Sequence, residues 1–181
     1  MSKANKSNKA IKYRLYPNDE QKVMFAKTFG CCRFVYNQLL ALQKQRYKDG
    51  ESHLSKLKSN EFATRTLKKD YDFLKEIDKF AVSNAVFHLA DAYDRFFKKQ
   101  NHFPKFKSKR KSKKSYTTNF TNNNILIGKN VIKLPKVGMV KAVIHRLPKD
   151  DWKLKSVTVS QDSVGNYFAS VLFEYEQEDI P

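Results

Sequence analysis

The sequence has few acidic residues, few cysteines and no long apolar run, and each shortage narrows the class of protein. Only 18 Asp and Glu stand against 36 Lys and Arg. Without a long apolar run, a signal peptide or a lipidation motif, a membrane-spanning or anchored protein is not indicated. The two cysteines, Cys31 and Cys32, are neighbours. Adjacent cysteines rarely bridge each other and do not supply the ligand pairs of a structural zinc site, so we expect reduced thiols in the cytoplasm.

The surplus of positive charge is the plainest feature of the composition. A formal net charge of +18 opposes compaction by self-repulsion, which a polyanionic partner offsets. Nucleic acid is the first candidate, because neutralising phosphates releases counterions. An anionic membrane surface and a merely basic protein are the alternatives. Apolar residues reach 40%, enough for one sizeable core or two small ones, which excludes global disorder.

The first fifty residues combine a polar start, a strand and helices. Residues 1–9 are lysine-rich and predict a flexible basic arm. Period-two alternation over 11–16 predicts a half-buried strand with Lys12 and Arg14 on its polar face. Asn18 can cap a following helix, which we expect Gly30 to interrupt before a second helix ends near residue 48. Two helices joined at a glycine fit a helix-turn-helix, although an ordinary helical hairpin fits better, because no base-reading face is evident.

The most regular helix is predicted to start after Asp78, a good capping residue. Its apolar residues recur at spacings of three and four, which places them on one buried stripe: Val82, Val86, Leu89, Tyr93 and Phe96. Lys79 and Ser83 are four residues apart on a polar face and would point together into solvent or toward a ligand.

Residues 105–114 hold seven basic residues and no acid. Such a block is not expected to fold on itself and usually marks an interaction segment. We predict contacts with a nucleic-acid backbone here, and a solvated linker or a localisation signal is the alternative. The backbone-binding candidates are Lys12, Arg14, Lys105, Lys107, Lys109, Arg110 and Lys111.

From residue 115 onward the pattern is that of β-structure. Short strands are predicted over 116–121, 125–127, 131–134, 139–145, 154–160 and 167–175, with a hairpin around Gly165. The early strand at 11–16 lacks a local partner and is expected to join this sheet. The predicted class is α+β, a small antiparallel barrel with helices inserted after its first strand. We expect domains over 10–17 plus 115–181 (barrel), 18–104 (helical) and 105–114 (basic linker).

No catalytic constellation is evident. The acids fall at helix starts, on helix surfaces and in turns, and not in the spaced set that would hold two metal ions. The histidines show no ligand spacing, and no phosphate-binding glycine loop or nucleophile elbow is present. We therefore assign no catalytic and no metal-binding residue, and expect a binding module.

Several segments, taken in order, resemble the opening of TnpB (OrfB) proteins of bacterial insertion sequences. The resemblance covers about residues 9–176, and the combination of segments is far more specific than any single one. The matching segments are 12–18 (KYRLYPN), 28–37 (TFGCCRFVYN), 78–81 (DKFA), 92–97 (AYDRFF), 103–106 (FPKF), 116–124 (YTTNFTNNN) and 133–138 (KLPKVG).

This resemblance implies the front part of an RNA-guided DNA endonuclease related to the type V CRISPR effectors. It implies a wedge β-barrel of OB-like type with an inserted helical recognition domain, and guide RNA and target double-stranded DNA as partners in the bacterial cytosol or nucleoid. By analogy, base pairing would read the target and protein would read a short adjacent DNA motif. The implied motif-contacting positions are Lys79, Ser83, Thr121, Asn122 and, with a poorer alignment, Ser55.

The chain departs from the family at some of these positions. Ser83 and Ser55 stand where relatives can carry Gln and Tyr, and a short hydroxyl cannot make the bidentate contact of a glutamine to adenine. A turn is the alternative role for Thr121 and Asn122.

The family's RuvC-like nuclease begins soon after the position of residues 180–181, where this sequence stops. We therefore expect no cleavage by this chain alone and no cofactor within it, with Mg and Zn bound only in that C-terminal domain. The alternatives are an RNA-independent DNA-binding regulator or transposition accessory protein, and one half of a split nuclease whose RuvC-like domain lies on another chain.

Overall fold

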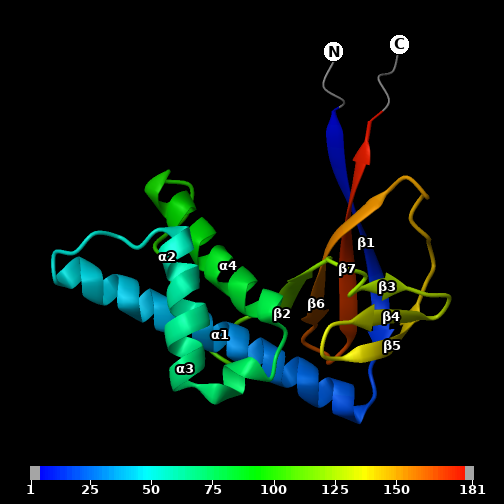
Figure 1. The fold of residues 1–181 in the computed structure, drawn as a ribbon, viewed down its shortest axis with the longest axis horizontal. Helices are drawn as coiled ribbons and strands as arrows, with labels where there is room; N and C mark the ends of the chain where they lie inside the picture. The colour runs from blue at the N-terminus through cyan, green and yellow to red at the C-terminus, as the bar shows by residue number, and fades with distance from the viewer. Residues whose placement is uncertain (1–4, 178–181) are drawn as a thin grey trace. The chain divides into compact units, whose positions relative to one another are not determined.

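The computed structural model of the chain describes residues 5–177 and has the predicted α+β class. It divides into two compact units (Figure 1), a sheet unit of residues up to 22 and from 117 onward and a helical unit of residues 23–116. Each unit has its own buried core and is described by itself.

The sheet unit is built on a seven-stranded sheet with the order β2-β6-β7-β1-β5-β4-β3. Its ladders are antiparallel, as predicted. Within the described residues β2 and β3 form its two edges, so the sheet is open and does not close into the expected barrel. The strands are β1 (Lys6–Tyr16), β2 (Lys114–Asn119), β3 (Leu126–Ile127), β4 (Val131–Leu134), β5 (Gly138–Val143), β6 (Lys153–Gln161) and β7 (Tyr167–Glu176).

Strand β1 lies in the middle of this sheet, between β7 and β5. Its buried residues pair with buried residues of β7, for example Tyr13 with Ala169 and Ile11 with Val171. The strand starts earlier than the predicted 11–16, because the end of β7 gives Lys6 a partner in Glu176. Residues 6–9 of the expected arm therefore belong to the strand, and residues 1–4 lie outside the described residues.

The hairpin between β6 and β7 turns at Gly165, as predicted, where φ is +98°. The Asp162 carboxylate closes the turn by accepting backbone N–H bonds from Val164 (3.0 Å) and Asn166 (2.8 Å). These bonds favour the charged form and hold the pKa of Asp162 below its usual value. A sharply defined turn fixes the register in which β6 and β7 pair.

The helical unit contains most of α1 (Asp19–Lys48), followed by α2 (Lys56–Glu61), a π-helical turn (Phe62–Leu67), α3 (Lys68–Asp70) and α4 (Lys79–Phe97). Helix α4 begins after Asp78, whose carboxylate accepts the N–H of Phe80 at 3.1 Å, as the sequence predicted. Of the predicted stripe, Val82, Val86, Leu89 and Tyr93 are buried, whereas Phe96 is half-buried. Because α2 and the π-helical turn pack on α4, this stripe is part of the core of the unit.

Helix α1 is continuous over 30 residues, so the predicted break at Gly30 is wrong. The helix-turn-helix and the helical hairpin are therefore both wrong for this segment. A single interior glycine weakens a helix by only about 1 kcal/mol, and burial of Phe29 and Cys32 on either side of it outweighs this cost. The start is fixed by Asn18 and Gln21, each of which bonds the backbone N–H of the other (2.8 and 3.0 Å).

Replacing Gly30 with Ala is expected to stabilise the chain by about 0.5–1 kcal/mol, because alanine loses less backbone entropy on folding. A Cβ at this position would meet only a guanidinium nitrogen of Arg33, at 3.7 Å, which is ordinary contact. Urea denaturation would measure the gain, and a loss of stability would show that the helix needs glycine here.

The adjacent cysteines are both unbridged and buried in α1. The Cys32 thiol donates to the carbonyl of Ala81 in α4 at 3.4 Å. Burial raises the pKa of Cys32 to about 12 and also raises that of Cys31, so neither forms a reactive thiolate at neutral pH. Cys32 therefore ties α1 to α4, and neither cysteine offers a nucleophile.

Candidate nucleic-acid interface

One face of the sheet carries cations around an aromatic ring. Lys12 places its ammonium 4.5 Å from the ring centre of Phe168, and the Arg14 guanidinium lies 5.4 Å from the same ring. Arg14 is also 4.8 Å from the ring of Tyr16, and it donates to the Oδ1 of Asn166 at 2.8 Å. The two predicted backbone-binding residues of β1 are thus brought together and held in fixed positions. We call Lys12, Arg14, Tyr16 and Phe168 the basic sheet face.

The residues around this face suit a polyanion. In β5, Lys141 pairs with Tyr16 and is exposed. In β7, Ser170 stands opposite Lys12 and adds a hydroxyl. Two acids lie on this side of β7, toward its end. Glu174 lies 3.5 Å from Lys6 and 3.9 Å from Lys155, so its charge is offset, and Glu176 pairs with Lys6 in the strand register. The surface can bind phosphates through its cations and stack bases or sugars on its rings.

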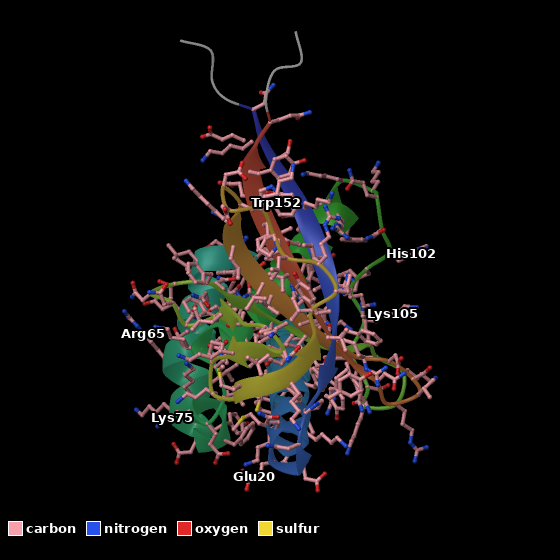
Figure 2. All side chains as sticks on the ribbon, turned by 90° about the vertical axis from the view of Figure 1, so that its right-hand side faces the viewer. Glu20, Arg65, Lys75, His102, Lys105 and Trp152 are labelled. Atoms are coloured by element: carbon pink, nitrogen blue, oxygen red, sulfur yellow. The ribbon has the colours of Figure 1, made fainter. Side chains whose placement is uncertain are left out.

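A second group of cations and rings in the sheet unit surrounds Trp152. Its ring stacks on Tyr175 at 5.5 Å, with Lys9 at 5.6 Å and Arg146 at 5.8 Å. Figure 2 labels Trp152. Trp152 comes from the turn before β6, so positive charge and aromatic surface also meet outside the basic sheet face.

The basic segment of residues 105–114, whose composition predicts no fold of its own, contains a hydrogen-bonded turn at residues 108–112. The hydroxyls of Ser108 and Ser112 accept backbone N–H bonds at 3.1 and 2.9 Å, which close a tight turn. Asn37 of α1 anchors the start of this turn, because its side-chain amide bonds both the N–H and the C=O of Lys107 at 2.8 Å. The turn presents exposed Lys109, Arg110 and Lys111.

Two lysines of this segment differ in their surroundings. Lys105 is exposed and lies, with His102, on the loop that follows α4, pointing away from the ribbon (Figure 2). Lys107 is half-buried, with its ammonium 4.2 Å from the ring centre of Tyr36. Burial lowers the pKa of Lys107. Its side chain therefore contributes to packing on α1, and the exposed neighbours are better placed to meet phosphates.

The predicted motif-contacting residues of the helical unit fall in two places. Lys79 and Ser83 lie one turn apart at the start of α4, with Lys79 exposed and Ser83 half-buried. Ser55 caps α2, where its hydroxyl accepts the N–H of Lys58 at 3.2 Å, and it lines a small hollow with Val86. Ser55 therefore has a structural role as the cap of α2, and it lies beside the middle of α4.

Thr121 and Asn122 belong to an exposed turn of the sheet unit. Asn122 and Asn123 adopt left-handed φ angles of +47° and +56°, and Asn124 accepts the N–H of Thr121 at 2.8 Å. The turn predicted as the alternative role for this pair is present. It displays both side chains to solvent, so the turn geometry and a contact with DNA are compatible.

Sequence reasoning missed Phe168, Lys141 and Asn37. Phe168 and Lys141 join Lys12, Arg14 and Tyr16 only through strand registers between residues far apart in the chain. Asn37 stands beside Lys107 only because the chain returns to α1 after α4.

The described residues show no group of three or more His, Cys, Asp or Glu that could hold a metal ion. No helix within residues 5–177 is long and apolar enough to cross a membrane.

A family model described as a helix-turn-helix domain (HTH_OrfB_IS605) matches residues 5–52. In this structure that region is strand β1 and the single helix α1. The chain is similar to a Streptomyces pristinaespiralis protein named as a candidate RNA-guided DNA endonuclease, with 31% identity over 168 residues. It is also similar to InsQ of Escherichia coli K12, which carries the same description, with 30% identity over 174 residues. The alignments cover 92% of this chain but 41% and 40% of those relatives.

A shorter relative, the virulence protein VsdF of Salmonella dublin, is 32% identical over 111 residues, which are 56% of this chain and 93% of VsdF. The chain belongs to the OrfB (TnpB) family of insertion-sequence proteins. It spans about two-fifths of the length of the two endonuclease relatives.

Proposed function

We propose that this chain is the nucleic-acid-binding part of an RNA-guided DNA endonuclease, which holds guide RNA and the DNA beside the target. The observation that carries the proposal is the folded basic segment. Its cations project from a turn that Asn37 anchors, so their positions are set before a partner arrives. The relatives named as RNA-guided endonucleases support the RNA and DNA partners.

We assign no cleavage step to the described residues of this chain. The described residues offer no cluster of carboxylates with other ligands for a pair of metal ions. We propose that catalysis, with any Mg or Zn it uses, belongs to the part of the longer relatives that this chain does not span. That part could be carried on the same polypeptide or on a second one.

Recovery of bound RNA from the purified chain, followed by sequencing, tests the proposal. One class of RNA from the end of an insertion sequence is expected. Gel shifts with duplex DNA in the absence of RNA distinguish this proposal from the alternative, an RNA-independent DNA-binding regulator. Tight, sequence-dependent binding of DNA alone would contradict the proposal and indicate an RNA-independent regulator.

Replacing Lys79 or Asn122 with Ala is expected to change which DNA sequence beside the target is preferred, while guide-RNA affinity changes little. Each loss of a good base contact should reduce discrimination by about 1–3 kcal/mol. This preference would be measured by the binding of the RNA-loaded chain to a library of duplexes with randomised sequence beside the target. The matched control is Lys58→Ala, another exposed helix lysine, for which an equal change in preference would contradict the assignment.

A further inference from the structure

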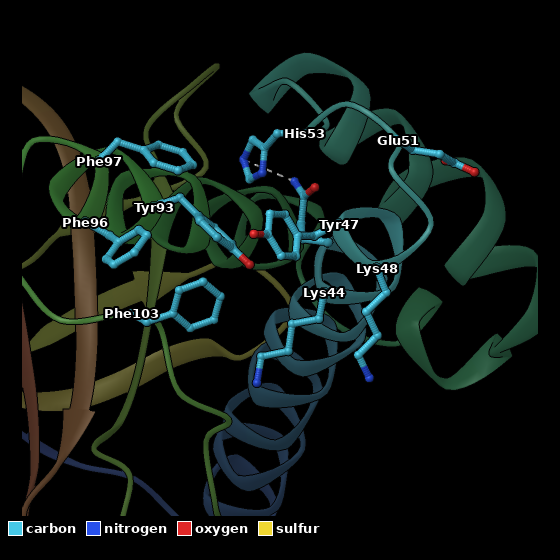
Figure 3. A pocket seen from close by; sticks show the side chains of 10 residues that line it. Lys44, Tyr47, Lys48, Glu51, His53, Tyr93, Phe96, Phe97 and Phe103 are labelled. Carbon is cyan, nitrogen blue, oxygen red and sulfur yellow. Dashed lines mark hydrogen bonds between the residues drawn. The ribbon is translucent and has the colours of Figure 1, made fainter.

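The helical unit contains an open aromatic pocket of about 660 Å³, a volume typical of small-ligand sites (Figure 3). Tyr47 and Lys44 of α1 form one wall, and Phe97 at the end of α4 and Phe103 after it form the other. His53, on the loop between α1 and α2, lies at a third side. The proposed target-motif and basic-segment residues do not line this pocket.

The rings of this pocket are unusually accessible for their size. Tyr47 is 85% exposed, Phe97 58% and Phe103 39%. Isolated exposed aromatics are ordinary, but several that converge on one cavity mark a binding surface. Buried Tyr93 supports the two phenylalanines, edge-on to Phe103 at 5.5 Å and 88°, and 5.9 Å from Phe97. These two rings are therefore packed from one side without closing the cavity, and Tyr47 lies across from them on α1.

The charge at the rim selects the kind of occupant. The Lys44 ammonium lies 5.5 Å from the ring centre of Phe103, and Lys48 extends from the same helix. One acid, Glu51, also lines the pocket, but it is paired with Arg46 at 2.6 Å, so its charge is offset. An occupant that fits is flat and apolar inside the pocket and negatively charged outside it. A nucleotide has this character, and an apolar peptide segment lacks the negative charge.

Hydrogen bonds to α1 hold the loop that forms the third side of the pocket. Gln43 bonds both the N–H and the C=O of Leu54 at 3.0 Å, and Arg46 donates to the C=O of Ser52 at 2.9 Å. These bonds fasten the loop that carries His53 to α1. Burial lowers the pKa of His53, which favours its neutral imidazole. The Gln43 amide lies 3.4 Å from Nε2 of His53 (Figure 3), so Nδ1 is the ring nitrogen left to meet the edge of a base.

We propose that this pocket binds an unpaired nucleobase of single-stranded nucleic acid, stacked between Tyr47 and the rings of Phe97 and Phe103, with its phosphates near Lys44 and Lys48. The inference rests on the proposed nucleic-acid function and adds to it a site that holds the base by its flat face, in addition to contacts with the backbone. Stacking is tolerant of sequence, because every base has a flat face.

The test uses fluorescence anisotropy with a labelled, unstructured oligoadenylate and with a matched oligomer that has the same phosphates but no bases. The double variant Tyr47→Ala, Phe97→Ala should bind oligoadenylate about five- to a hundredfold more weakly than the unaltered chain. It should bind the abasic oligomer equally well. The control is Tyr71→Ala, Phe73→Ala, which removes two exposed rings of another cluster in the same unit and should change neither affinity.

The possible outcomes separate the two proposals. If the unaltered chain binds both oligomers equally, or if the pocket variant keeps its affinity for oligoadenylate, the pocket does not hold a base, while the proposed function stands. If the unaltered chain binds neither oligomer nor duplex, the proposed function fails as well. Photocrosslinking of 4-thiouridine RNA to the unaltered chain tests the site without a folding risk. Adducts on peptides with Tyr47 or Phe103 support it, and adducts confined to other peptides overturn it.

Discussion

Replacing Lys105, Lys109, Arg110 and Lys111 together with Ala is expected to weaken nucleic-acid binding by at least about a hundredfold at low salt. All four side chains are exposed on the ordered basic segment. Each phosphate contact that is lost also lowers the salt dependence of the logarithm of the affinity by about 0.9 for duplex DNA. The slope should therefore fall by roughly three units if most of the four side chains meet phosphates. Titrations at several salt concentrations would measure both quantities.

The control for this variant removes the same charge from other places. Lys22, Lys58, Lys69 and Lys129 are exposed and scattered over α1, α2, α3 and the turn between β3 and β4. Their replacement by Ala should lower affinity only slightly, through the weaker field of the whole chain. If both quadruple variants lose equal affinity and slope, net charge alone drives binding and the basic segment is not a site. Lys107 stays in both variants, because its part-buried side chain supports the fold.

Local signals in the sequence predicted the elements of this fold closely. Asp78 starts α4 in the structure as in the prediction, and Gly165 turns the last hairpin. The expected strands near 131–134 and 167–175 match β4 and β7 within one residue. Caps, turn residues and alternation act over a few neighbouring positions, so a sequence is enough to find them.

The errors arose where distant packing decided the outcome. Gly30 is a sound local reason for a break, yet buried neighbours on both sides carry α1 through it. Lys6–Lys9 look like a polar arm, yet the end of β7 lies beside them and extends β1. Closure of the sheet into a barrel also depends on contacts between its edges, which no local pattern encodes.

The candidate site was only partly predictable for the same reason. Composition pointed to residues 105–114 and alternation to Lys12 and Arg14. The ring between these two cations, Phe168, comes from a strand more than one hundred and fifty positions away, aligned by the register of β1 and β7. The sequence also could not show that Asn37 would turn a charged run into an ordered surface.

The helical unit thus supplies an ordered basic turn and the sheet unit a basic sheet face, each held by contacts of its own. Removing the exposed charges of the turn should leave Lys12, Arg14 and Phe168 in place, because their contacts lie within the sheet unit. Residual binding by the quadruple variant would then be expected, with a smaller salt slope. A variant that combines these four substitutions with Lys12→Ala should lose the sum of the two binding free energies if the two surfaces act independently.

The second large effect is expected from replacing Asn37, the residue that anchors the basic segment to α1. Asn37→Ala removes both hydrogen bonds to the backbone of Lys107 and leaves a part-buried N–H and C=O without those partners. The free energy of unfolding is expected to fall by about 2 kcal/mol, which urea denaturation would measure. Trypsin should also cut the segment faster, because its turn is no longer fastened to α1.

The same substitution shows whether nucleic-acid affinity depends on the fixed positions of the cations in the basic segment or only on their charge. Asn37→Ala leaves every lysine and arginine in place, so a loss of affinity would come from the disordered positions of the cations. Gln45→Ala is the matched control on α1, since its amide bonds only the exposed Asp49 at 3.0 Å and its loss should change stability by less than about 0.5 kcal/mol. If Asn37→Ala weakens binding and Gln45→Ala does not, the anchored geometry of the segment contributes to recognition. If Asn37→Ala opens the segment to trypsin but binds as tightly as the unaltered chain, charge density alone is sufficient and preorganisation has no part in the affinity.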